Sequence, residues 1–217
     1  MREAVIHRIL NKKLIAIVRG IRNREQCLAL AGAILDGGID LLEITFDQSA
    51  PENFSDTLNA ITAVNQHFEG RICVGAGTVM TPEQVKLAAD AGAKYMISPN
   101  VNADVIEATR SMGLVSMPGA MSPSEIAAAH GAGADFVKLF PAGVLGCDYV
   151  RAVRAPLSQI RILAVGGVNP GNIPDFLAAG CLGFGIGGNL VNKQWVEAGE
   201  FDKITEVAKQ FCSAVGR

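Results

Sequence analysis

The sequence predicts an α/β fold in which short apolar strands alternate with helices along one chain. First, the 217 residues are 49% hydrophobic and only 18% charged, which permits a large core and excludes a disordered protein. Second, helical stretches end in glycine, which tolerates the left-handed C-terminal position, and lead directly into apolar strands; this occurs at 35–44, 89–98, 111–117, 130–140 and 178–187. Third, helix caps precede the helices, at TPEQ (81–84), SPSE (122–125), NPGN (169–172) and NREQ (23–26).

The elements follow in order from the N-terminus. Residues 1–13 mix charged and apolar side chains as an amphipathic helix does, and lack the continuous apolar core of a signal peptide. Eight strands are predicted next, rich in Val, Ile and Leu like parallel strands buried on both faces, at 14–18, 39–44, 72–75, 94–97, 114–117, 135–139, 162–165 and 182–186. We therefore predict one domain over residues 1–217, a single TIM (β/α)8 barrel with an N-terminal helix.

A doubly wound parallel sheet is the alternative fold. Such a sheet usually needs fewer strands, and its dinucleotide-binding glycine pattern is missing after the first strand, where the turn reads RGIRNRE (19–25). No shift in composition and no long linker indicates a second domain.

Composition also narrows the functional classes. The formal net charge of −2 argues against binding to nucleic acid or to an anionic membrane. No apolar run approaches the ~18 residues of a membrane-spanning helix. The 5 cysteines form no CxxC pair, which favours a reduced, cytoplasmic protein, and the 3 scattered histidines predict no metal site.

A lysine interrupts the sixth apolar strand. Lys138 lies between Val137 and Leu139, and the two-residue period of a strand places it on the face shared by Phe136 and Phe140. Burial of the ammonium lowers the lysine pKa and makes it a nucleophilic amine near neutral pH. The alternative is a lysine that reaches out of the strand end or forms a structural ion pair.

Glu43 is placed in the same way in the second strand. Leu41, Glu43 and Thr45 share one face of that strand. A carboxylate inside the barrel could pair with Lys138 and act as general acid and base, or form only a structural ion pair with it. Each residue supports the other, because either charge would be costly to bury alone.

Two glycine-rich loops follow the last two strands, AVGGVNPGNI (164–173) and GFGIGGNLV (183–191). Phosphate sites in barrels often use these two loops, where bare backbone N–H groups face the anion. We therefore predict a phosphate site there, with ordinary tight turns as the alternative.

Seven segments in this order resemble one family, that of the 2-keto-3-deoxy-6-phosphogluconate (KDPG) and 4-hydroxy-2-oxoglutarate (KHG) aldolases, which also includes phosphogalactonate aldolases. They cover nearly the whole chain: IAIVRG (15–20), GGIDLLEITF (37–46), VGAGTV (74–79), ISPN (97–100), MPGAMSPSE (117–125), VKLFPA (137–142) and GGVNP (166–170).

The resemblance implies a class I aldolase that cleaves a 2-keto-4-hydroxy acid to pyruvate and an aldehyde, either glyceraldehyde 3-phosphate or glyoxylate. It implies that Lys138 is the Schiff-base lysine and Glu43 the general acid and base. Substrate-binding residues are expected at Arg19, Thr45, Thr78, Pro99 and Phe140, and phosphate-binding residues at Gly166, Gly167, Gly187 and Gly188. It further implies a small-molecule 2-keto acid substrate, a homotrimer and no metal or other cofactor.

Two positions depart from the family pattern. Some members carry arginine two residues after the threonine of the E-x-T motif, where this chain has Asp47. Members commonly place serine in the strand-eight phosphate loop, where the matching position is Gly188, followed by Asn189. These changes weaken phosphate binding unless backbone N–H groups suffice and Asp47 faces solvent. The preferred aldehyde therefore stays open.

Two other functions fit the barrel and its glycine loops. One is a phosphosugar isomerase or epimerase, which needs no imine. The other is a non-catalytic phosphosugar-binding protein, which has no need for a lysine and a glutamate buried together.

Overall fold

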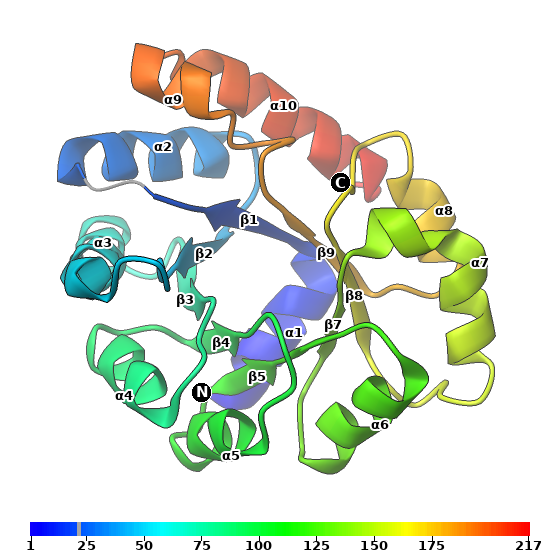
Figure 1. Cartoon of the computed structure of the whole chain (residues 1–217). Helices are drawn as coiled ribbons and strands as arrows, with labels where there is room; N and C mark the ends of the chain where they lie inside the picture. Colours follow the sequence, from blue (N-terminus) through cyan, green and yellow to red (C-terminus); the bar gives the residue numbers. More distant parts are fainter. Residues whose placement is uncertain (21–22) are drawn as a thin grey trace.

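The computed structural model describes residues 1–20 and 23–217 and shows a barrel of parallel strands inside a ring of helices (Figure 1). The strands are β1 (Leu14–Val18), β2 (Leu41–Thr45), β3 (Cys73–Gly77), β4 (Tyr95–Ile97), β5 (Val115–Met117), β6 (Gly119–Ala120), β7 (Val137–Leu139), β8 (Ile162–Val165) and β9 (Gly183–Ile186). Their order around the sheet is β5-β4-β3-β2-β1-β9-β8-β7-β6. This arrangement confirms the predicted α/β barrel.

Helices precede, separate and follow these strands. They are α1 (Arg2–Lys12), α2 (Arg24–Asp36), α3 (Phe54–Phe68), α4 (Pro82–Asp90), α5 (Ala103–Ser111), α6 (Pro123–Gly131), α7 (Ala142–Arg154), α8 (Ile173–Ala178), α9 (Lys193–Ala198) and α10 (Phe201–Ala214), with a short 3-10 turn at Pro51–Asn53. The five glycines predicted to end helices all have positive φ values, at Gly38, Gly92, Gly113, Gly133 and Gly180.

The predicted fifth strand, 114–117, is present as β5, and a two-residue strand that was not predicted, β6, follows it. β5 pairs with β4 on one side, and β6 pairs with β7 on the other. Pro118 separates them, because it has no N–H to donate to a strand ladder. Its carbonyl accepts a hydrogen bond of 2.9 Å from the Lys138 N–H. β5 and β6 together complete the barrel, so the described residues form nine short strands where eight were predicted.

The helix caps match the prediction in part. Asn23, Thr81 and Ser122 each accept a hydrogen bond from the third residue of the helix that follows. The NPGN prediction was wrong, because α8 begins only at Ile173. The Asn169 side chain instead accepts bonds from two N–H groups inside its own loop.

The N-terminal helix closes one end of the barrel. Val5, Ile6 and Ile9 of α1 pack among the inward-facing residues Leu41 and Phe136. In Figure 1, α1 crosses the far end of the barrel behind the strands. Ion pairs join this helix to the nearby chain: Arg2 pairs with Asp135, and Arg8 and Lys12 both pair with Asp40. A ligand therefore has to enter from the opposite end, where the strands terminate.

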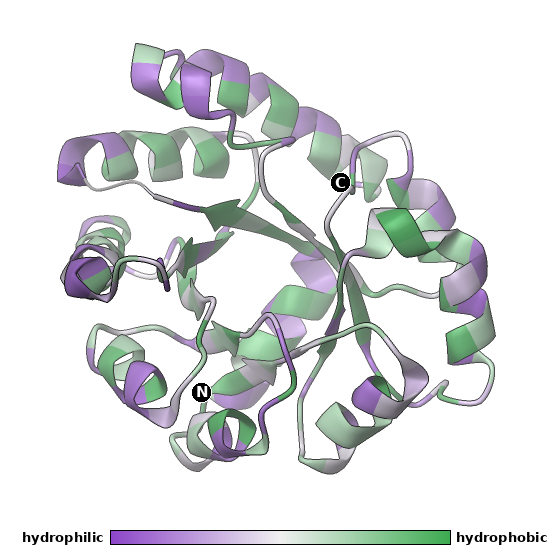
Figure 2. Cartoon of the chain, viewed as in Figure 1, coloured by the Kyte–Doolittle hydropathy of each residue, from purple (hydrophilic) through white to green (hydrophobic). Residues whose placement is uncertain are grey.

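The larger core cluster lies between the outer face of the strands and the helices. In Figure 2 the strands are mostly hydrophobic, whereas the helices carry hydrophilic residues on their outer sides. Among the described residues, no helix is long and apolar enough to cross a membrane.

Candidate active site

A cavity of about 910 Å³ opens at the carboxyl ends of the strands. Nine of the eleven site residues predicted from the sequence line it: Arg19, Thr78, Pro99, Lys138, Phe140, Gly166, Gly167, Gly187 and Gly188. Glu43 and Thr45 lie deeper, on the inward face of β2, and are buried. The strand ends thus bring residues that are far apart in the sequence to one cavity.

Lys138 is buried in β7 and is only 8% exposed. Its Nζ lies 5.2 Å from the centroid of the Phe140 ring. Burial lowers the pKa of Lys138 from its usual value; the charge on Glu43 opposes that shift, and the charge on Arg19 adds to it. The amine is therefore more readily neutral than that of a surface lysine, and a neutral amine is a nucleophile.

Glu43 is 1% exposed, and its Oε2 has no hydrogen-bond partner among the residues that the structure describes. Burial raises the pKa of this carboxyl, while the positive charges of Lys138 and Arg19 act in the opposite direction. No ion pair within 4.0 Å joins Glu43 to Lys138 in the described chain. This spacing disfavours a purely structural pair and leaves both groups available to a ligand.

Glycine makes room for the carboxylate of Glu43. A Cβ added at Gly77 in β3 would lie 1.9 Å from Glu43 Oε1, which is far inside contact distance. Thr45 follows Glu43 on the same face, and its buried Oγ1 has no hydrogen-bond partner. Because buried polar atoms are normally hydrogen-bonded, two such atoms on one strand face indicate space for a polar ligand or water.

Thr78 holds an unusual backbone conformation at the wall of the cavity. Its φ angle is +56°, in the left-handed region that β-branched residues rarely adopt. Elsewhere in this part of the barrel, Gly119 allows β6 to approach the loop after β4 closely, because a Cβ there would lie 2.5 Å from the Pro99 carbonyl oxygen.

The two glycine loops form the outer part of the cavity. Gly166 and Gly167 have φ values of +87° and +77°. The side chains of Asn172 and Asn189 brace this loop by donating to the carbonyls of Gly167 and Val168. Within the described residues, no group accepts a hydrogen bond from the backbone N–H of any of the four predicted phosphate-binding glycines. Such N–H groups can receive an anion.

Asp47 lies away from this cavity. Its side chain is exposed and accepts hydrogen bonds from the Ser49 N–H at 3.1 Å and the Ser49 hydroxyl at 2.6 Å. It is not part of the cavity lining. The chain therefore holds this carboxylate at the surface rather than against the glycine loops.

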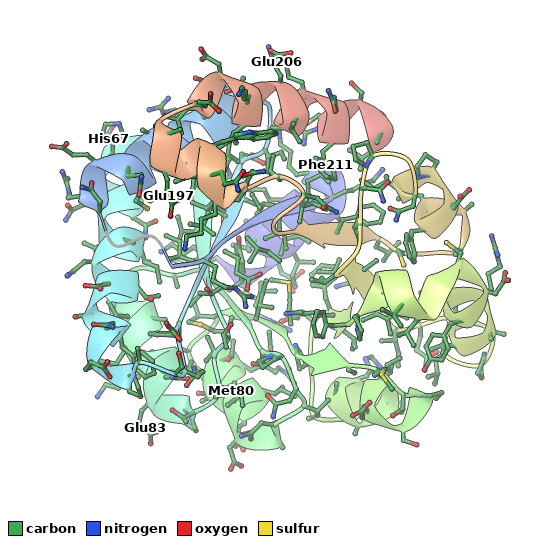
Figure 3. All side chains as sticks on the ribbon, turned by 45° about the horizontal axis from the view of Figure 1, so that its top comes forward. His67, Met80, Glu83, Glu197, Glu206 and Phe211 are labelled. Carbon is green, nitrogen blue, oxygen red and sulfur yellow. The ribbon has the colours of Figure 1, made fainter. Side chains whose placement is uncertain are left out.

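Sequence reasoning did not assign four polar residues of the cavity lining to the site: Gln26 of α2, Asn189 of the second glycine loop, and Lys193 and Glu197 of α9. Lys193 Nζ lies 3.6 Å from Glu197 Oε1. Figure 3 labels Glu197 on α9, above the mouth of the barrel. The signal was present, because Asn192 caps a helix that begins directly after the second glycine loop.

Known proteins of one family resemble this chain over most of its length. A family model described as "KDPG and KHG aldolase" matches residues 5–207. A Rhizobium meliloti (strain 1021) protein named "Probable 2-dehydro-3-deoxy-6-phosphogalactonate aldolase" is 38% identical over 192 residues, 88% of this chain and 87% of that protein. The "KHG/KDPG aldolase" of Escherichia coli (strain K12) is 32% identical over 88% of this chain and 86% of its own.

Two solved structures superpose on this chain over most of its length. One described as "Native KDPGal structure" superposes with a TM-score of 0.82 at 35% identity, covering 93% of each chain. A KDPG aldolase from Legionella pneumophila, with pyruvate captured as a covalent carbinolamine intermediate, superposes with a TM-score of 0.84 at 26% identity. That match covers 96% of this chain and 97% of the other.

Proposed function

The chain belongs to the KDPG and KHG aldolase family, and from this we propose that it cleaves a 2-keto-4-hydroxy acid to pyruvate and an aldehyde through a Schiff base on Lys138. The proposal rests above all on the buried amine of Lys138, whose lowered pKa suits it to attack a carbonyl carbon. Carbon–carbon lyase chemistry is common to the named relatives.

The reaction begins at the ketone. Neutral Lys138 Nζ attacks C2 of the 2-keto acid, and loss of water from the carbinolamine gives an iminium ion. This positive group then withdraws electrons from the C3–C4 bond. Its charge is formed only during the reaction, so the resting site does not have to bury a permanent ammonium.

Glu43 carries the proton. As a carboxylate it removes the proton from the C4 hydroxyl, directly or through a water molecule. The C3–C4 bond breaks, the aldehyde forms, and the bonding electrons move into an enamine on Lys138. Protonation at C3 and hydrolysis release pyruvate and restore the amine. The raised pKa of Glu43 fits a group that must both accept and return a proton.

The outer part of the cavity favours an anionic end on the substrate. The N–H groups of the four predicted phosphate-binding glycines lack protein acceptors among the described residues, and Lys193 supplies a cation at the rim. This supports 2-dehydro-3-deoxy-6-phosphogluconate as a substrate, with glyceraldehyde 3-phosphate as the aldehyde. The phosphogalactonate isomer is the second candidate, because the 38% identical Rhizobium meliloti relative bears that name. 4-Hydroxy-2-oxoglutarate, which yields glyoxylate, is the third.

A coupled assay that follows pyruvate with lactate dehydrogenase tests these candidates. We expect turnover of more than one of the three substrates and loss of turnover in Lys138→Met. Lys209→Met, an exposed lysine of α10, is the matched control and keeps wild-type activity. Substantial pyruvate release by Lys138→Met would contradict the Schiff-base mechanism. An isomerase or epimerase would release no pyruvate and would convert a phosphosugar with or without Lys138, and saturable binding without pyruvate release or conversion would fit a binding protein.

The family resemblance also leads us to propose a homotrimer in the cytoplasm, with no metal and no other cofactor. Light scattering of the purified chain tests the trimer, and activity after dialysis against a chelator tests the metal independence.

A further inference from the structure

We infer that Gln48 and Gln84 are positioning residues, which act as an amide bridge that holds Thr78 in its left-handed conformation against the substrate. Thr78 lines the cavity together with Lys138. Its contact with substrate rests on the proposed function, whereas the bridge itself is a feature of the fold.

The bridge is a chain of three hydrogen bonds between two loops. Gln48, in the loop after β2, donates from Nε2 to the carbonyl oxygen of Thr78 at 2.6 Å. Its own Oε1 accepts a bond of 3.1 Å from Nε2 of Gln84. Oε1 of Gln84 accepts from the Met80 N–H at 2.7 Å. Figure 3 labels Met80, which belongs to the loop between β3 and α4.

The direction of these bonds is fixed at one end. A backbone N–H can only donate, so Met80 forces Gln84 to present its oxygen to the loop and its NH2 group to Gln48. Gln48 must then point its own NH2 group at the Thr78 carbonyl. Gln84 is 4% exposed, so water does not readily replace its bond to Met80, whereas Gln48 lies at the surface.

Gln84 departs from its expected role in a way that supports this inference. In the TPEQ pattern its side chain would return to the N–H of the cap residue Thr81, as Glu125 does for Ser122. The Thr81 hydroxyl does accept from the Gln84 N–H. The Gln84 side chain, however, bonds to Met80 instead. The helix α4 therefore lacks the second hydrogen bond of a capping box, and its Gln84 side chain is linked instead to the loop that contains Thr78.

The bridge holds the peptide carbonyl of Thr78 between two strand-end hydrogen bonds. Gly77 accepts from the Phe46 N–H at 2.9 Å, and the Val79 N–H donates to Ile97 at 3.1 Å. These bonds hold the chain on both sides of Thr78, whose own carbonyl is held by Gln48. Without that bond, the Thr78 backbone can relax toward a negative φ, which turns its side chain away from the cavity wall.

Gln84→Glu is a size-matched test of the bridge. The ionised carboxylate of this variant still accepts from Met80 but has no hydrogen to donate, so the Gln48 amide turns its NH2 group toward it and presents oxygen to the Thr78 carbonyl. We expect kcat/KM for pyruvate release to fall about tenfold, because small displacements of a substrate-positioning group are costly. Gln210→Glu, on the exposed side of α10, controls for the added charge.

A double-mutant cycle separates positioning from mere structural support. Thr78→Val removes the hydroxyl and keeps the branched side chain, whereas Thr78→Ser keeps the hydroxyl. We expect Gln84→Glu to cost less than about twofold in the Thr78→Val background and to keep its full cost in the Thr78→Ser background. An equal loss in all three backgrounds, or activity of Gln84→Glu within twofold of wild type, overturns the inference.

Amide hydrogen exchange gives a readout that does not depend on activity. We expect faster exchange across residues 78–81 in Gln48→Met than in wild type, because the Thr78 carbonyl loses its donor. Unchanged exchange there overturns the inference even if the wild-type enzyme releases no pyruvate. Absence of pyruvate release with faster exchange rejects the proposed function and retains the bridge.

Discussion

Gly77→Ala is the perturbation whose effect can be worked most directly from the structure. The added Cβ would lie 1.9 Å from Glu43 Oε1, 2.6 Å from Cδ and 2.6 Å from Cγ. An acceptable contact is about 3.2 Å, so the carboxylate has to move by roughly 1.3 Å or the strands have to separate. The φ of Gly77 is not positive, so alanine itself causes no backbone strain there.

Two quantities should change in Gly77→Ala. A displacement of about 1 Å of a catalytic group costs on the order of 100-fold, so kcat should fall by about that factor. Overpacking of a buried site costs about 1–3 kcal/mol, which lowers the Tm of a chain of this size by roughly 2–12 °C. The pyruvate-release assay measures the first effect, and thermal unfolding followed by circular dichroism measures the second.

Gly131→Ala is the matched control for the alanine substitution. Gly131 lies in α6, its added Cβ would meet no atom within 4 Å, and its φ is not positive. Alanine at that position should leave kcat unchanged and raise the stability slightly. A Gly77→Ala enzyme with a kcat within twofold of wild type would refute the role of the Glu43 position in catalysis.

Three further predictions follow from the charges. Glu43→Gln should raise the Tm at about pH 8 more than at about pH 4. Because folding raises the pKa of Glu43, the wild-type protein loses stability as pH rises above the ordinary carboxyl value. The amide of the variant does not titrate, so the variant does not lose this stability. Lys193→Ala should raise KM about three- to tenfold for the phosphorylated substrates and leave 4-hydroxy-2-oxoglutarate unchanged, with exposed Lys209→Ala as control; equal effects on both substrate classes would contradict this. Asp135→Ala should lower the stability by about 2 kcal/mol with kcat unchanged, because Asp135 holds Arg2 at the closed end of the barrel; a lower kcat in the folded variant would contradict the separation of the two ends.

Local sequence patterns predicted the structure correctly where the tertiary environment favours the same conformation or the same burial. Two-residue alternation in apolar strands placed Lys138 and Glu43 inside the barrel, and both are buried there. Glycine after a helix predicted five positive φ values correctly, because few other residues tolerate that conformation. The first and seventh predicted strands have the expected bounds, 14–18 and 162–165.

Other features depend on contacts that local patterns do not carry. The amphipathic pattern predicted α1 but not its place across the barrel end, which depends on packing with strands far along the chain. The predicted fifth strand ends before Pro118, and the two-residue strand β6 beyond it was missed because two residues carry no periodic pattern. The side chain of Gln84 bonds to Met80 rather than to its own helix cap. Lys193 lines the cavity because of the direction in which α9 runs. Both outcomes depend on how neighbouring loops meet.

The most direct test of the proposed function is borohydride trapping of the protein with pyruvate, followed by peptide mapping. Reduction of the iminium should leave one pyruvate-derived group on Lys138, with none on the exposed Lys209 and none anywhere in Lys138→Met. Folded wild-type protein that releases pyruvate from substrate and yet forms no adduct at Lys138 would contradict the Schiff-base account.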